Sequence, residues 1–235
     1  SGEIYADDGQ QKQATPREIM RRNLHFIEKV GNGQFGEVFK AMLDEQQGRG
    51  TPEYMVAANT VKDAANNPEG AQELVAEAAV MMRVAGHANL VSIIGVVTTG
   101  DPLILILQYC EHGSLLGYLK KTFAAGEEVS VRDKMVMAAE IANGMAHLAK
   151  MRFIHRDLAA RNVLLSTGKT TSTHGVVCKV ADFGLSRGAN SGEDSGGNED
   201  YYKSSSGVFP VRWTAPEAME TLKFSTASDV WSFAS

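Results

Sequence analysis

The chain has 235 residues and a formal net charge of -5, and 43% of its residues are hydrophobic and 22% charged. This balance is typical of a globular protein and excludes a disordered, collagenous or coiled-coil chain. A mildly acidic chain gives no basic footprint for nucleic acid, so no nucleic-acid partner is expected. The longest apolar runs, such as residues 103–107, are much shorter than the ~20 residues that cross a bilayer. Cys110 and Cys178 are too few for a disulfide framework and indicate a reducing, cytoplasmic compartment.

The first part of the chain predicts a leader followed by strands. Residues 1–23 are polar and have no apolar period, so we expect a leader or linker there. Short apolar runs at 24–30 and 37–43 are separated by glycines and predict a β-hairpin. After a polar loop, residues 54–61 predict a third strand.

Helices become frequent further along the chain. Residues 71–84 have apolar side chains at helical spacing and predict a first helix. The runs at 90–97 and 102–109 predict two more strands, and 114–122 and 131–151 predict two more helices. Because strands precede most helices instead of alternating with them, the pattern favours an α+β fold with two lobes.

Three glycines, Gly31, Gly33 and Gly36, lie between the first two predicted strands, with Phe35 beside them. Glycine lets the backbone turn sharply and approach a ligand closely, so amide groups of such a turn can point at phosphate oxygens. The ending of a P-loop is missing, and the glycines lead into a strand and not into the helix of a dinucleotide site. Alone, the pattern fits an ordinary hairpin turn as well as a phosphate-binding loop.

The segment 155–162, with the sequence HRDLAARN, follows the long predicted helix. Asp157 and Asn162 are five residues apart and precede an apolar run at 163–165. This spacing suits one carboxylate that accepts a proton and one amide that holds a metal ion. Adjacent polar residues in an apolar context need such a use, because their burial without partners costs free energy.

Two shorter motifs complete a series. The sequence DFG stands at 182–184, after an apolar strand predicted at 176–181, and APE stands at 215–217. In this order, the glycine turn, HRD, DFG and APE form the signature set of protein kinases. From about residue 24 to its last residue, the chain resembles the catalytic domain of that family. The sequence LAAR after Asp157 and the sequence PVRWTAPE at 210–217 resemble its tyrosine-kinase branch.

The resemblance implies a two-lobed α+β protein-kinase fold. Residues 1–23 then match a juxtamembrane-like leader, and 24–106 the small, ATP-binding lobe. Residues 107–235 match the hinge and a partial large lobe with the catalytic and activation loops. The implied reaction transfers the γ-phosphate of ATP to tyrosine hydroxyls of protein substrates with the help of Mg²⁺.

The same resemblance implies roles for the motif residues. Asp157 is expected to orient the substrate hydroxyl and to accept its proton, and Arg161 to support that geometry. Asn162 and Asp182 are expected to hold Mg²⁺ beside the nucleotide phosphates. Glu77 matches the glutamate of the small-lobe helix.

The nucleotide site is expected to combine the glycine turn, the hinge and the apolar residues above and below adenine. Apolar members of this set could equally fill a core. The residues assigned to it by the resemblance are Gly31, Gly33, Phe35, Gly36, Val38, Ala57, Leu107 as gatekeeper, Gln108, Tyr109, Cys110 and Leu164.

The third predicted strand departs from the family pattern. The family has a lysine there that binds the α- and β-phosphates and pairs with the helix glutamate. This chain has Asn59 at the matching position, and Lys62 follows three residues later. Because strand side chains alternate between faces, Ala57 and Asn59 are expected on one face and Lys62 on the other, unless a bulge intervenes. We therefore expect Asn59 at the lysine position of the nucleotide site, with Lys62 as the alternative.

Two functions are compatible with these residues. One is an ATP-dependent protein-tyrosine kinase, and the other is a pseudokinase or phosphotyrosine-bearing scaffold in which Asn59 impairs transfer. The chain stops inside the helix that supports the catalytic loop in kinases, which we interpret as a C-terminally incomplete domain.

The resemblance to receptor-type members rests on the paired Tyr201 and Tyr202 and on the segment 108–115. It implies that these tyrosines are regulatory phosphorylation sites. It also implies tyrosine-containing protein substrates, phosphotyrosine-binding adaptors and dimerisation of a full-length receptor. The chain is then expected to be the cytoplasmic portion of a single-pass membrane receptor, which meets the membrane only through flanking segments.

Overall fold

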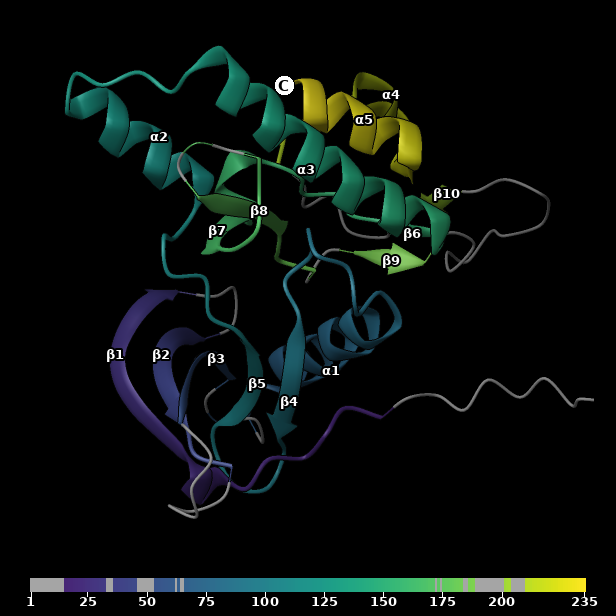
Figure 1. Ribbon diagram of the computed structural model, residues 1–235. Helices are drawn as coiled ribbons and strands as arrows, with labels where there is room; N and C mark the ends of the chain where they lie inside the picture. Colours follow the sequence, from purple (N-terminus) through teal and green to yellow (C-terminus); the bar gives the residue numbers. More distant parts are fainter. Residues whose placement is uncertain are drawn as a thin grey trace, which may run out of the picture.

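The protein folds into two lobes in a computed structural model. Figure 1 shows a small lobe with a curved sheet and one long helix, and a large lobe that consists mainly of helices. The two-lobed α+β fold expected from the sequence is confirmed. The structure describes residues 15–32, 36–45, 53–61, 63, 66–171, 173, 175–183, 186–188, 201–203 and 210–235.

The small lobe contains an antiparallel sheet of five strands in the order β1-β2-β3-β5-β4. The predicted hairpin and third strand are confirmed, since β1 pairs with β2 and β2 with β3. The strands are β1 (Leu24–Asn32), β2 (Glu37–Leu43), β3 (Tyr54–Val61), β4 (Ile93–Val97) and β5 (Leu103–Gln108).

Helix α1 (Pro68–Arg83) packs against this sheet. It begins where Pro68 fits the first turn and where the Asn67 side chain accepts a hydrogen bond from the Gly70 amide. Leu74 and Ala78 are buried at helical spacing, as the sequence predicts. This face fixes α1 beside the sheet.

The segment before β1 is docked on the sheet. Backbone bonds join the Ile19 N–H to the Val96 carbonyl (2.7 Å) and the Val96 N–H to the Arg17 carbonyl (2.8 Å). Ile19 is 3% exposed and belongs to the core of the small lobe. A side chain at Gly95 would clash with the Arg17 carbonyl, since an added Cβ would lie 2.5 Å from it. The polar sequence pattern of the leader does not indicate this edge contact.

The large lobe contains four helices and three short two-stranded sheets among its described residues. Serine side chains cap three of these helices, at Ser114, Ser130 and Ser225. The helices are α2 (Leu115–Ala124), α3 (Val131–Lys150), α4 (Pro216–Thr221) and α5 (Thr226–Ala234). The paired strands are β6 (Phe153–Ile154) with β9 (Arg187–Gly188), β7 (Val163–Thr167) with β8 (Val176–Val180), and β10 (Tyr201–Lys203) with β11 (Lys223–Ser225).

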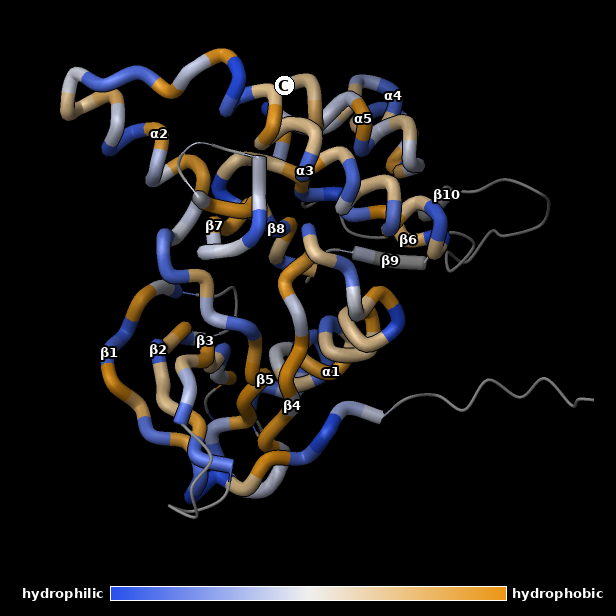
Figure 2. Tube along the Cα trace, in the orientation of Figure 1, coloured by the Kyte–Doolittle hydropathy of each residue, from blue (hydrophilic) through white to orange (hydrophobic). Residues whose placement is uncertain are grey.

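One apolar core joins the lobes. It extends from Leu74 and Met81 of α1 to Leu148 of α3 and to Phe183. Figure 2 shows hydrophobic residues concentrated along the neighbouring strands β4 and β5. The shared core means that α1 and the segment around Phe183 cannot move independently without loss of apolar contact.

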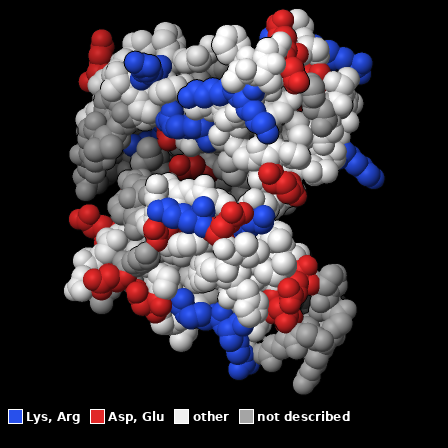
Figure 3. Space-filling model, turned by 90° about the vertical axis from the view of Figure 1, so that its left-hand side faces the viewer, with Lys and Arg blue, Asp and Glu red and all other residues white. Residues whose placement is uncertain are grey.

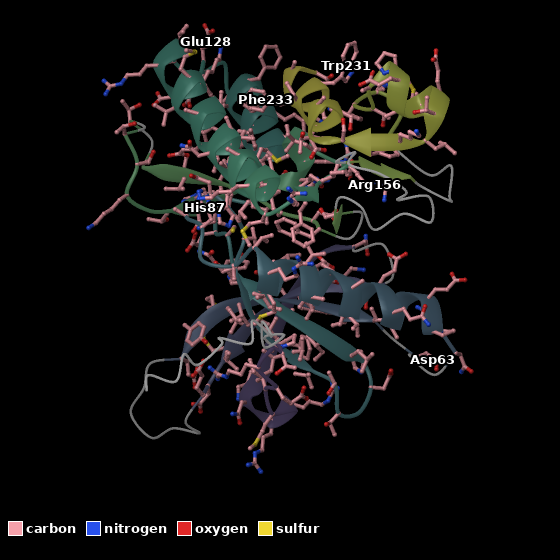
Figure 4. All side chains as sticks on the ribbon, turned by 90° about the vertical axis from the view of Figure 1, so that its right-hand side faces the viewer. Asp63, His87, Glu128, Arg156, Trp231 and Phe233 are labelled. Atoms are coloured by element: carbon pink, nitrogen blue, oxygen red, sulfur yellow. The ribbon has the colours of Figure 1, made fainter. Side chains whose placement is uncertain are left out.

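The last helix presents apolar side chains to solvent. Trp231 is 49% exposed and Phe233 41% exposed, and both lie at the outer end of the large lobe (Figure 4). Within the described residues, no helix combines the length and the apolar character that crossing a membrane requires.

We predict that Ile19→Ala lowers the free energy of unfolding by about 2 kcal/mol or more, because it removes a buried aliphatic side chain. Urea denaturation measures this change. The neighbouring variant Met20→Ala is the matched control, since Met20 is 58% exposed and its loss should change stability by no more than about 0.5 kcal/mol. Equal effects of the two variants would show that docking of the leader does not stabilise the small lobe.

Candidate active site

A cavity of about 680 Å³ lies between the two lobes. In the space-filling view, the lobes are separated by a hollow in which acidic side chains are visible (Figure 3). Most residues predicted for the nucleotide, metal and catalytic sites line this cavity. They are Gly31, Val38, Ala57, Asn59, Glu77, Leu107, Gln108, Tyr109, Cys110, Arg161, Asn162, Leu164 and Asp182.

The glycine turn is described only in part. Gly33 and Phe35 lie outside the described residues, and so does Lys62. Gly36 does not line the cavity. Instead, a Cβ at Gly36 would lie 1.6 Å from the Thr60 carbonyl oxygen, so only glycine fits this approach to β3.

Asn59 faces the cavity from the middle of the sheet. It pairs with Val38 of β2 on one side and with Leu105 of β5 on the other. Its neighbours Ala58 and Thr60 point to the opposite face, where both are buried. Ala57 and Asn59 therefore share the face that lines the cavity.

Glu77 reaches the cavity from α1. Burial raises the pKa of Glu77 to about 7, and the nearby Asp182 carboxylate contributes in the same direction. A hydrogen bond from the backbone N–H of Phe183 acts against this rise. Among the lining residues that the structure describes, Arg161 has the one fixed positive charge, and it comes from the large lobe. Glu77 thus links α1 to the DFG segment by accepting a backbone N–H.

The carboxylate of Asp157 is held by two neighbours in the segment 155–162, the expected catalytic loop. The Arg161 guanidinium forms an ion pair with Oδ1, and the Asn162 amide donates to Oδ2 at 2.7 Å. Burial raises the pKa of Asp157, whereas Arg161 and the hydrogen bond from Asn162 lower it. Asp157 does not line the cavity itself but is fixed beside it through two residues that do. A carboxylate held in this way can accept a proton from a hydroxyl at the cavity mouth.

Asn162 and Asp182 provide oxygen atoms for a cation. Both amide hydrogens of Asn162 are directed at Asp157, because Nδ2 also donates to the Asp157 carbonyl at 2.8 Å. Its Oδ1 is therefore the atom suited to a cation. The Ala181 N–H donates to the Asn162 carbonyl at 2.8 Å, which brings the adjacent Asp182 close to it. An amide oxygen and a carboxylate are ligands that Mg²⁺ prefers, so these residues fit that ion.

The DFG backbone adopts a special conformation. Asp182 has a φ of +64°, and the next residue, Phe183, is fully buried. The Phe183 ring lies 5.7 Å from the His155 ring, and His155 Nε2 lies 3.1 Å from the Ala181 carbonyl oxygen. The left-handed turn at Asp182 directs Phe183 into the core while Asp182 stays in the cavity.

Asp229 of α5 anchors the catalytic loop. Its carboxylate accepts the backbone N–H groups of His155 (2.8 Å) and Arg156 (2.9 Å), and it is 5% exposed. Burial raises the pKa of Asp229, against the lowering by His155, Arg156 and these two bonds. The sequence analysis assigned no role to Asp229, because its partners lie more than 70 residues earlier in the chain.

Trp213, in the segment 210–217, is a second residue near the site to which the sequence analysis assigned no individual role. The Arg161 guanidinium lies over its ring, 4.4 Å from the centroid. The Ser232 hydroxyl of α5 donates to the Trp213 carbonyl at 2.7 Å. Arg161 is therefore held between a carboxylate on one side and an aromatic ring on the other.

The backbone of the predicted regulatory tyrosines is described in β10, and their side chains lie outside the description. Tyr201 pairs with Ser225 and Tyr202 with Phe224 of β11. The Arg156 guanidinium lies over the Phe224 ring at 4.6 Å. The register of the two strands thus places β10 beside Phe224, the residue that packs on Arg156.

Comparisons with known proteins agree with this geometry. The family model described as protein tyrosine and serine/threonine kinase matches residues 24–235. The tyrosine-protein kinase FRK of Homo sapiens is 39% identical over 217 residues, which are 92% of this chain and 38% of that protein. Ephrin type-B receptor 1 and ephrin type-A receptor 5 of Gallus gallus are each 37% identical over 229 residues, or 97% of this chain and 21% of each receptor. The chain thus spans well under half the length of these relatives.

Proposed function

Because the chain belongs to the protein tyrosine and serine/threonine kinase family, we propose that it transfers the γ-phosphate of ATP to tyrosine hydroxyls of protein substrates. The observation that carries this proposal is the Asp157 carboxylate, held by Arg161 and Asn162 at the edge of the cavity between the lobes. The relative named tyrosine-protein kinase FRK supports tyrosine as the acceptor.

In this proposal, the adenine base lies between Val38 and Ala57 above and Leu164 below, against the hinge backbone at 108–110. Oδ1 of Asn162 and the Asp182 carboxylate would hold Mg²⁺, and the ion would supply positive charge to the nucleotide phosphates. Asp157 orients the tyrosine hydroxyl and accepts its proton, and Arg161 keeps the Asp157 carboxylate in place. Binding and positioning supply most of the rate acceleration in such a site.

A second candidate is a domain that binds nucleotide and partners but transfers phosphate poorly. The observation that favours it is Asn59, which lines the cavity where the family has a lysine. A neutral amide cannot neutralise the α- and β-phosphates, nor can it form an ion pair with Glu77. The other residues proposed to hold the nucleotide and Mg²⁺ are present, so binding should be affected less than transfer.

We predict that Asn59→Lys raises the rate of phosphate transfer to a tyrosine-containing peptide at least tenfold. A hydrogen bond to a charged group contributes roughly 1.5–3 kcal/mol. At 1.36 kcal/mol per tenfold in rate, this bond corresponds to about 10- to 150-fold. Steady-state transfer of labelled γ-phosphate measures the change, with Asp157→Asn as the inactive reference.

The matched control for Asn59→Lys is Lys62→Ala in the natural sequence, which should change transfer little. If Lys62→Ala instead abolishes transfer, Lys62 is the phosphate-binding lysine and the argument from Asn59 is wrong. If neither the natural chain nor Asn59→Lys transfers phosphate above the Asp157→Asn reference, while both bind ATP, the second candidate function replaces the first.

We also propose that Tyr201 and Tyr202 are phosphorylation sites that regulate this activity. A phosphate there adds about -1.5 to -2 charge and can pair with Arg156, which packs on Phe224 opposite Tyr202 in the β10–β11 ladder. Mass spectrometry after activation of the full-length protein is expected to find phosphate on one or both tyrosines. Good coverage of this peptide without phosphate would contradict the proposal.

The division of the chain and its place in a longer protein are also proposals. We propose residues 1–23 as a juxtamembrane-like leader, 24–106 as the small lobe and 107–235 as the hinge and large-lobe portion. Two of the relatives are named as receptors, which supports placement in the cytoplasmic portion of a membrane receptor. Receptor dimerisation and phosphotyrosine-binding adaptors belong to the same proposal.

A further inference from the structure

The connection between α1 and β4, residues 84–91, is attached to the large lobe by several contacts. The Val91 N–H donates to the Val180 carbonyl and the Val180 N–H to the Asn89 carbonyl, each at 2.9 Å. The Asn89 side chain donates to the Cys178 carbonyl at 3.0 Å. On α3, a Cβ at Gly144 would lie only 2.7 Å from the Asn89 carbonyl oxygen, so the helix backbone comes very close. This connection is thus a second junction between the lobes, separate from the hinge.

Two histidines stack in this junction. The rings of His87, from the connection, and His147, from α3, lie 4.8 Å apart with an interplanar angle of 24°. Both side chains are half-buried. Figure 4 shows His87 at the level where the two lobes meet. The two residues are 60 positions apart in the sequence, so only the fold brings them together.

The hydrogen bonds of the two rings define where their protons lie. The Asn89 N–H donates to Nδ1 of His87 at 3.2 Å, so this nitrogen accepts and the neutral ring carries its proton on Nε2. Nε2 of His147 lies 3.2 Å from the Val84 carbonyl oxygen, which can only accept, so it carries a proton. A second proton on His87 must therefore go to Nδ1, where it would abolish the bond from Asn89.

The charges near His87 also oppose its protonation. Lys179 of β8 donates to the Ala88 carbonyl at 2.6 Å, next to His87 in the chain, while His147 stacks on the His87 ring. Arg83 at the end of α1 lies over the Phe153 ring of β6. The carboxylates of Glu111 and Glu140 act on Lys179 from the hinge side and from α3. Burial, His147 and Lys179 lower the pKa of His87, in that order.

We propose that the His87–His147 pair is a pH-sensitive element, in which protonation of His87 releases residues 84–91 from the large lobe. In the closed junction, the stacked rings, the Asn89–His87 hydrogen bond and the Lys179–Ala88 hydrogen bond are compatible with a neutral His87. A proton on Nδ1 of His87 removes the hydrogen bond from the Asn89 N–H. It also places a positive charge beside Lys179 and His147. Because the released ring binds the proton more tightly than the closed one, a fall in pH shifts the equilibrium toward release.

Release of this junction has a direct route to the candidate active site. Leu90 forms a parallel bridge with Val180 of β8, and the chain continues from Val180 through Ala181 to Asp182. The same connection follows directly on the C-terminal end of α1, and α1 carries Glu77 in its middle. Acidification is therefore expected to loosen α1 and the DFG segment together. This inference does not depend on phosphate transfer, because the contacts that carry it lie outside the cavity.

Hydrogen–deuterium exchange of the intact chain tests the proposal at about pH 7.5 and about pH 5.5, values that lie on either side of the usual histidine pKa. After correction for intrinsic exchange rates, we expect the amides of Val91 and Val180 to lose protection several-fold at the lower pH. The amides of β3 are the internal reference and should keep theirs. Unchanged protection of Val91 and Val180, or a parallel loss in β3, would overturn the proposal.

The decisive variant is His87→Asn, whose side-chain oxygen can still accept the Asn89 N–H but cannot take up a proton. It should abolish the pH-dependent loss, whereas His25→Asn, at an exposed position of β1, should preserve it. His147→Gln is a second variant, since its amide can still donate to the Val84 carbonyl; it should weaken the loss by removal of the neighbouring ring. If every folded variant keeps the parental loss, a different group titrates and the proposal is wrong.

Discussion

The candidate active site depends most on the two hydrogen bonds that the Asp229 carboxylate accepts from the His155 and Arg156 backbone. Arg156 has a φ of +71°, a conformation that non-glycine residues adopt only when their surroundings compensate its cost. The two bonds supply that compensation in a buried position. With the backbone fixed there, the turn that follows can hold Asp157 against Arg161 and Asn162, and His155 can contact the DFG segment.

Asn59 changes how the small lobe is tied to this site. Glu77 lies in the cavity with no described lysine among the lining residues, and burial raises its pKa to about 7. It nevertheless accepts the backbone N–H of Phe183. The position of α1 therefore depends on that bond, on the shared apolar core and on the second junction at residues 84–91. These contacts keep α1 close to Asp182, although Asn59 cannot form an ion pair with Glu77.

Features with a local physical cause could be predicted from the sequence. The strands and helices follow from apolar periodicity. The third strand, β3, has the predicted bounds 54–61, and its side chains alternate between the core and the cavity. The motif residues Asn162 and Asp182 were identified by their spacing and by resemblance to a family. Features that depend on tertiary contact could not be predicted. Docking of the leader needs the space above Gly95, and the roles of Asp229 and His147 depend on partners 60 or more residues away in the sequence.

The central claim, that Asp229 holds the catalytic loop, is tested most directly by amide exchange at His155 and Arg156 in the variant Asp229→Ala. A buried donor left without its acceptor costs about 1–3 kcal/mol, and about 1.4 kcal/mol corresponds to tenfold, so protection of the two amides should fall about 5- to 150-fold. Asp229→Asn, which keeps one carbonyl oxygen, should lose less, and the amides of β3 in the small lobe should not change. Protection at His155 and Arg156 that is the same in Asp229→Ala as in the natural chain would contradict the account.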